Sequence, residues 1–192
     1  MIDSDYYKDY MVFPSNNYKD DVRLVQEFYV NTVQDNDLLE SVVEEQSILW
    51  SDDIDFSLIM VLRTLENSRQ HQQDLALLRE YKSEEDVVFV KELFRKTVLN
   101  FNEYQQYIER FTKNWDVERI AFLDNIIMAA AMAELLGFSS IPVKVTMDEY
   151  IEISKYYSTP GSSLFINGVL DKIVDSLRAE GKINKTGRGL ME

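Results

Sequence analysis

The side chains in this sequence that could support catalysis or bind a metal are carboxylates and one histidine. Adjacent acids occur at 44–45 and 52–53, and Glu149 and Glu152 are spaced to share one helix face. General acid–base chemistry needs such groups to converge in a pocket, and a zinc site needs imidazole or thiolate ligands beside them. His71 is the one histidine, and the chain has no cysteine. A hydrolase that uses the carboxylates stays an alternative, but the sequence favours a protein without catalytic residues, metal or cofactor.

Composition limits the environment and the partners. The 192 residues include no apolar run long enough to span a membrane and no signal-peptide pattern, so we expect a cytoplasmic protein. The net charge is −14, and residues 1–100 hold 21 acidic and 10 basic residues against 13 and 10 in residues 101–192. Such a surface repels a phosphate backbone unless basic groups gather locally, and it attracts a basic protein. Solubility alone is the other explanation of the charge.

The spacing of apolar residues predicts an all-α fold of about seven to eight helices in two packed bundles. Apolar residues recur at steps of three and four, and glycine and proline are few. The expected helices cover 22–33, 36–49, 53–66, 83–99, 102–113, 116–136, 146–157 and 162–180. Gly137 is expected to end a helix, and Thr146 with Glu149 fits a capping box. We expect Leu75, Leu77 and Leu78 of the polar linker to dock onto the core, and the tail from Gly181 to fray.

A degenerate internal duplication is predicted at an offset of 65 residues. Eight identities fall in the 30 positions 21–50, and both tryptophans, Trp50 and Trp115, share this register. We therefore expect an N-terminal helical unit with its linker at 1–83, as the degenerate copy, and a C-terminal helical bundle at 84–192.

The C-terminal third contains an ordered set of motifs. They are Glu134-Leu135, Pro142, Val145-Thr146-Met147-Asp148-Glu149, Ile151-Glu152-Ile153-Ser154-Lys155 and Phe165-Ile166-Asn167-Gly168-Val169-Leu170-Asp171. In order and spacing this set resembles the NusB family of transcription antitermination factors over about 60 residues. Gly168 costs about 1 kcal/mol inside a helix relative to alanine. We expect it to permit close approach of the 116–136 helix, which has an alanine-rich face.

The resemblance implies a non-catalytic factor in ribosomal RNA transcription. NusB-family proteins pair with NusE, a small-subunit ribosomal protein, bind boxA-type RNA and act in the RNA polymerase antitermination complex. By match to family motifs, Lys155, Tyr157, Phe165 and Lys172 are the candidate RNA-binding residues, and Glu118 and Asp124 are the candidate partner-binding residues. Aromatic rings stack on splayed bases and lysine meets phosphate, and opposite charge across the protein interface aids encounter with a basic partner. Residues 172–188 add a basic C-terminal edge.

One departure from the family concerns the start of the chain. The family normally opens with an arginine-rich, RNA-contacting helix, whereas this chain opens with acids and tyrosines. The chain therefore resembles the C-terminal part of a longer family member, and we expect weak RNA binding by the chain alone. The alternative function is a helical protein–protein interaction module in which RNA binding is weak or lost.

Overall fold

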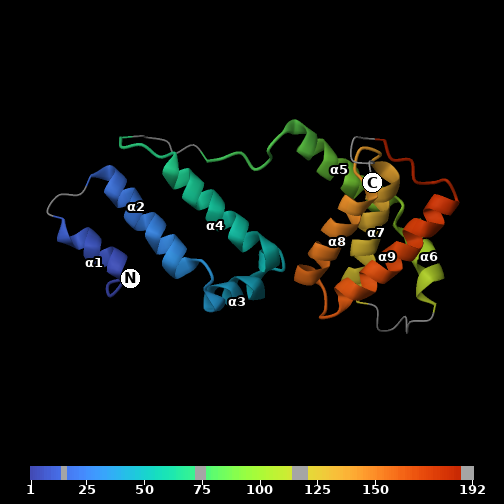
Figure 1. Ribbon diagram of the computed structural model, residues 1–192, viewed down its shortest axis with the longest axis horizontal. Helices are drawn as coiled ribbons and strands as arrows, with labels where there is room; N and C mark the ends of the chain where they lie inside the picture. Colours follow the sequence, from blue (N-terminus) through green and yellow to red (C-terminus); the bar gives the residue numbers. More distant parts are fainter. Residues whose placement is uncertain (14–16, 72–76, 114–120, 187–192) are drawn as a thin grey trace. The chain divides into compact units, whose positions relative to one another are not determined.

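The computed structural model describes residues 1–13, 17–71, 77–113 and 121–186. Over these residues every regular element is helical, with nine α-helices and one π-helix, so the predicted all-α fold is confirmed. The chain divides into two compact units, Met1–Glu80 and Tyr81–Glu192. Figure 1 shows both, with α1 to α4 in the first and α5 to α9 in the second.

The N-terminal unit consists of α1 (Asp5–Val12), α2 (Tyr18–Phe28), the π-helical η1 (Tyr29–Val33), α3 (Asp37–Gln46) and α4 (Trp50–Glu66). The starts of α2 and α3 are capped by Asn17 and Asn36, whose side chains accept hydrogen bonds from backbone amides of the first turn. Helix α1 was not predicted. Among the described residues of this unit only Thr64 is buried, so its helices leave much apolar surface exposed.

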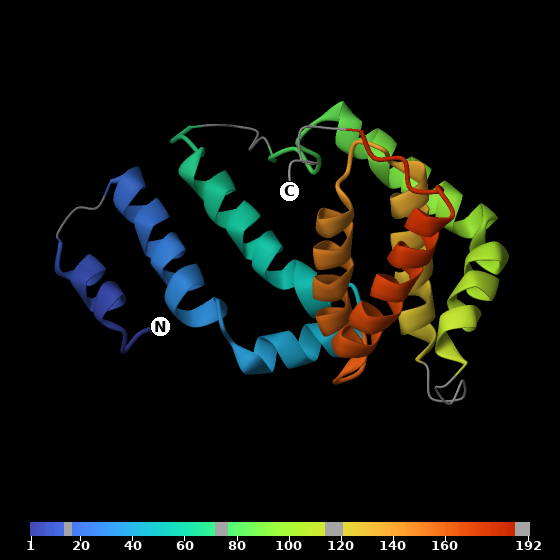
Figure 2. The same ribbon diagram turned by 45° about the vertical axis from the view of Figure 1, so that its right-hand side comes forward.

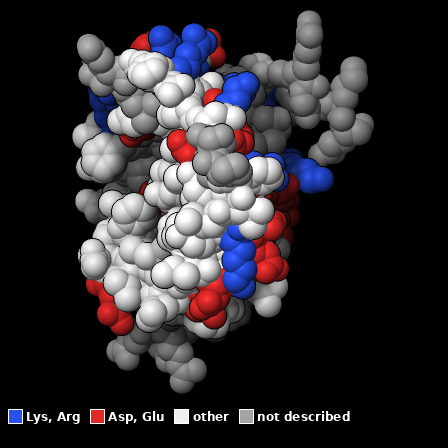
Figure 3. Space-filling view, turned by 90° about the vertical axis from the view of Figure 1, so that its left-hand side faces the viewer, with Lys and Arg blue, Asp and Glu red and all other residues white. Residues whose placement is uncertain are grey.

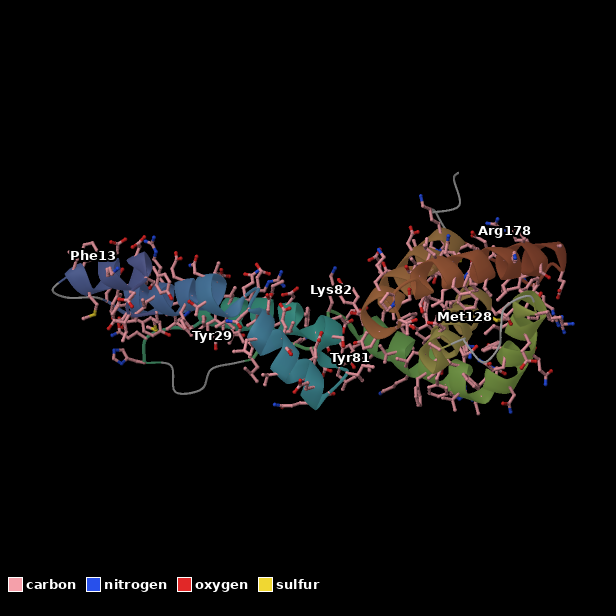
Figure 4. All side chains as sticks on the ribbon, turned by 90° about the horizontal axis from the view of Figure 1, so that it is seen from below. Phe13, Tyr29, Tyr81, Lys82, Met128 and Arg178 are labelled. Atoms are coloured by element: carbon pink, nitrogen blue, oxygen red, sulfur yellow. The ribbon has the colours of Figure 1, made fainter. Side chains whose placement is uncertain are left out.

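The C-terminal unit holds the core. It consists of α5 (Glu84–Leu99), α6 (Phe101–Thr112), α7 (Phe122–Gly137), α8 (Val143–Tyr157) and α9 (Ser162–Ala179). Helix α7 contacts all four others, and its apolar side chains, such as Met128, Met132 and Leu135, are almost completely buried. Figures 1 and 2 show α7, α8 and α9 side by side, and Figure 4 places Met128 among them. Every buried hydrophobic side chain of the described residues belongs to this unit.

Two predictions about motif residues were wrong. Helix α8 begins at Val143 after Pro142 rather than at residue 146, so Thr146 lies inside the helix and caps nothing. Proline suits the residue just before a helix, because its missing amide is not needed there. Gly168 is exposed, and a Cβ built on it would meet nothing within 4 Å. It therefore does not permit the close approach of α7 that the sequence suggested.

The ends of the predicted segments also need correction. Leu77 and Leu78 are exposed rather than docked on the core, and Leu75 lies outside the described residues. The tail beyond α9 is tied down through its described part, because the amide of Lys182 donates to the carbonyl of Leu177 and the amide of Thr186 to that of Ser139. Gly137 does end α7, as expected.

The helices follow the order that the predicted duplication requires. Adding 65 to the bounds of α2 with η1, and of α3, gives 83–98 and 102–111, close to α5 and α6. Helix α4 corresponds in order to α7. Residues 114–120, which precede α7, lie outside the described residues. The common origin of the two units stays a prediction.

Candidate nucleic-acid and partner interface

Three helix ends of the C-terminal unit meet at one corner. It consists of the first turn of α7, the last turn of α8, the first turn of α9 and residues 158–161, which join α8 to α9. The carboxylate of Asp124 in α7 accepts hydrogen bonds from Ser158 and from Ser162, the latter at 3.0 Å. The Ser162 hydroxyl also bonds that of Thr159, at 2.8 Å. Asp124 is only 3% exposed, so it acts as an internal anchor that fixes the turn. We call this region the α8–α9 corner.

The predicted RNA-binding residues lie at or near this corner. Lys155 is exposed in the last turn of α8 and pairs with Glu152. Tyr157 and Phe165 are partly buried and pack against the core. Lys172 is exposed on α9, about 10 Å beyond Phe165 at 1.5 Å per helical residue. Three of the four side chains are thus close to one turn, and their contact with RNA stays a prediction.

The predicted partner-binding acids are placed differently. Glu118 lies outside the described residues. Asp124 directs its carboxylate inward to the two serines, so in this structure it offers no charge at the surface. Its contact with a partner stays a prediction, and its observed contacts are those of a positioning residue.

The sequence reasoning missed three exposed apolar side chains at the same corner. Leu164 is 80% exposed in the first turn of α9, Phe122 is 74% exposed at the first position of α7, and Tyr156 is exposed near the end of α8. Aromatic rings without a core contact can stack on bases or insert into a partner surface. The available signal was the pair Tyr156-Tyr157, since adjacent helical side chains point in directions about 100° apart and a narrow core-facing stripe takes only one of them.

The outer face of α9 continues from the corner. Leu164, Gly168 and Lys172 follow at intervals of four residues, so they share one helix face. The glycine in the middle has no packing partner within 4 Å. This face therefore has no side chain at its centre, an apolar side chain at one end and a cationic side chain at the other.

Beyond Lys172 the basic C-terminal edge does not join this face, because Lys182 and Lys185 bond other groups at the far end of α9. Lys185 donates to the carbonyls of Glu134 and Phe138 at the end of α7, and burial lowers the pKa of its ammonium group. Lys182 pairs with Glu180 at 2.6 Å. Hydrogen bonds from Lys182 and from the Tyr107 hydroxyl lower the pKa of Glu180 to about 2.

The Glu134 motif position belongs to a buried polar network. Its carboxylate accepts hydrogen bonds from the hydroxyls of Thr146 at 2.8 Å and Tyr150 at 3.2 Å. Burial, and then the charge of Glu134, raise the pKa of Tyr150 well above its usual value. A buried charge needs such donors, so these motif residues join α7 to α8 rather than contact a ligand.

The described residues offer neither a metal site nor a membrane span. No three histidine or acidic side chains among them are grouped so that they could hold an ion. None of the helices in the described ranges is long and apolar enough to cross a bilayer. The described residues thus define an all-helical protein with its buried hydrophobic core in the C-terminal unit.

Comparison with known proteins identifies the family. The family model of the NusB family matches residues 54–175, which is more than half of the chain. The chain belongs to the NusB family. It is 47% identical over 103 residues to the transcription antitermination protein NusB of Salinibacter ruber, and 36% identical over 104 residues to that of Chloroherpeton thalassium.

These matches cover part of each protein. They span 54% of this chain in both cases, with 64% of the Salinibacter protein and 49% of the Chloroherpeton protein. This chain thus spans about half to two thirds of those relatives. A solved structure of T. maritima NusB is 32% identical, with a TM-score of 0.46, over 52% of this chain and 70% of that one.

Proposed function

We propose that this chain is a non-catalytic transcription antitermination factor that binds a NusE-like small-subunit ribosomal protein and boxA-type RNA. Family membership and the printed names of its relatives support the antitermination role. The observation that carries the RNA assignment is the α8–α9 corner. There Lys155 and exposed apolar side chains surround a turn that Asp124 fixes from within.

The structure suggests how the corner contributes to binding. The hydrogen bonds of Asp124 hold the turn in one conformation before a ligand arrives, which lowers the conformational entropy cost of binding. Exposed rings such as Tyr156 and Phe122 then supply stacking surfaces, and Lys155 and Lys172 supply positive charge.

The test is a binding titration of the full chain with labelled boxA RNA, with and without the NusE-like ribosomal protein. We expect weak binding to RNA alone and a clear gain in affinity when the ribosomal protein is present. Nanomolar binding of RNA by the chain alone at physiological salt would contradict the expected dependence on the partner.

A matched pair of lysine variants locates the RNA. Lys155→Gln and Lys144→Gln make the same charge change at exposed positions of α8, about 16 Å apart along the helix. If Lys155 meets phosphate, its variant lowers the salt dependence of ternary binding by about 0.7 in log–log slope, whereas Lys144→Gln leaves it unchanged. Equal effects of the two substitutions would remove the corner as the RNA site.

A protein–protein module with weak or lost RNA binding is the second candidate. The net charge of −14 favours it, as does the use of Lys155 and Lys182 in pairs with neighbouring acids. A stable binary complex with the ribosomal protein that recruits no RNA is the result expected from this candidate.

A further inference from the structure

The N-terminal unit presents an apolar surface that its own helices do not cover. Leu38 and Val42 lie one turn apart on α3 and are both exposed, Leu38 by 75%. The chain then leaves α3, and Ile48, Leu49 and Trp50 follow, with Leu49 exposed by 64%. We call these five side chains the α3–α4 surface. It lies outside residues 54–175, which match the NusB family.

The chain segment that carries this surface has charges of one sign only. From Leu24 to Leu62 the chain has nine acidic residues and no lysine, arginine or histidine. Asp37, Glu44 and Glu45 are exposed on α3 itself. Figure 3 shows the face on the α1 side, where a broad uncharged area is bordered by both acidic and basic groups.

The corresponding part of the C-terminal unit differs in this respect. Residues 89–127, which lie 65 positions further on, hold six acidic and six basic residues. At that offset Glu45 stands in place of Arg110, and Ile48 in place of Lys113. The same helical pattern therefore occurs with and without cations, so the lack of cations is a property of the N-terminal unit and not a requirement of the helices.

Isolated apolar side chains at a surface need no explanation, but five in one short segment suggest a contact site. An anionic rim repels nucleic acid, anionic lipid and a second copy of this acidic chain, and it attracts cationic protein. We propose that the α3–α4 surface binds a lysine- or arginine-rich protein segment that has an apolar face. The apolar side chains supply the buried contact and the acids select the partner. This site shares no residue with the α8–α9 corner, so its test does not depend on the proposed function.

The probe for this proposal is a synthetic helical peptide of lysine and leucine at amphipathic spacing, with a glutamate–leucine peptide of the same pattern as the charge control. Binding of each to the full chain is measured by fluorescence anisotropy at 0.1 and 0.5 M salt. We expect the cationic peptide to bind and to protect residues 37–53 from hydrogen exchange. The affinity of the cationic peptide should be lower at 0.5 M than at 0.1 M salt, and the anionic peptide should not bind.

Two double variants separate a site from general attraction to an acidic protein. Leu38→Gln with Val42→Gln keeps the charge, removes apolar contact and affects only exposed residues, so folding is preserved. We expect the affinity for the cationic peptide to fall at least tenfold. Val88→Gln with Val98→Gln makes a matched change at exposed positions of α5 and should change the affinity less than twofold.

Other outcomes overturn the proposal. Equal loss in both double variants, or no loss in either, shows that the peptide has no defined binding site at the α3–α4 surface. A sedimentation experiment in which the chain dimerises, and Leu38→Gln with Val42→Gln abolishes the dimer, assigns the surface to a second copy. Preferential protection of residues 37–53 by boxA RNA assigns it to nucleic acid.

Discussion

Replacing Gly168 by alanine separates the stability of the C-terminal unit from the binding proposed for it. The residue lies inside α9, where glycine is less favourable than alanine by about 1 kcal/mol. A Cβ at this position meets no atom within 4 Å, so no steric cost offsets the gain. We therefore expect the free energy of unfolding of this unit to rise by about 1 kcal/mol. In urea this moves the unfolding midpoint upward by about 0.5 M.

The control is Gly161→Ala in the turn that precedes α9. Gly161 has φ of +94°, a conformation that costs a non-glycine residue about 1–3 kcal/mol, so this variant should lose stability although its Cβ also meets open space. Urea unfolding followed by circular dichroism measures both changes. A loss of stability in Gly168→Ala would refute the reasoning, because it would mean that the methyl group meets atoms that the structure does not place there.

The same substitution tests the outer face of α9. If a partner or RNA approaches Gly168 closely between Leu164 and Lys172, the added methyl group weakens the ternary complex while the free protein becomes more stable. Opposite signs in the two assays would show that the glycine serves binding. A gain in stability with unchanged binding would exclude the centre of this face from the interface.

Three further predictions concern the buried polar groups. Thr146→Val removes a donor from the carboxylate of Glu134 and should cost about 1–3 kcal/mol in urea unfolding; an unchanged midpoint would contradict the role given to this bond. The pKa of Tyr150 is raised by burial and by Glu134, so its contribution to stability is complete below its unfolded value of about 10 and is lost as the pH rises above it. Between pH 8 and 11 the wild-type chain should therefore lose more stability than Tyr150→Phe, and parallel curves would disprove this. Asp124→Ala should speed hydrogen exchange at residues 158–162 and cost about 1–3 kcal/mol, while Asp171→Ala, at an exposed position of α9, should leave both nearly unchanged.

Local periodicity was sufficient to predict most of the helices, but not the roles of polar motif residues. Thr146 and Glu149 have the spacing of a capping box, and the same threonine can equally well bond a carboxylate across a helix pair. Pro142 decides between these, because it places the start of α8 one turn earlier. The acceptor is Glu134, 12 residues away in α7, and a single sequence contains no direct sign of that contact.

The lack of information on distant contacts in a single sequence also explains why the surroundings of Asp124 were not predicted. Asp124 has the position of an exposed first-turn acid, which favours a helix N-terminus, yet its partners are serines 34 and 38 residues further along the chain. Burial of such an acid depends on the packing of α8 and α9 against α7. Exposure of Phe122 and Leu164 depends on the same packing, so apolar residues that would ordinarily be assigned to the core are found at the surface.

The motif from Phe165 to Asp171 combines residues that the packing of the core explains with a residue that packing does not explain. Ile166, Val169 and Leu170 are almost completely buried, so their apolar character follows from packing alone. Gly168 occupies the opposite face, where the fold gains nothing from it and the helix loses about 1 kcal/mol. A residue that lowers stability and has no packing role within the chain is best explained by contact with another molecule. The buried half of this motif therefore accounts for the fold, and the exposed half is where contacts with RNA or a ribosomal protein should be sought first.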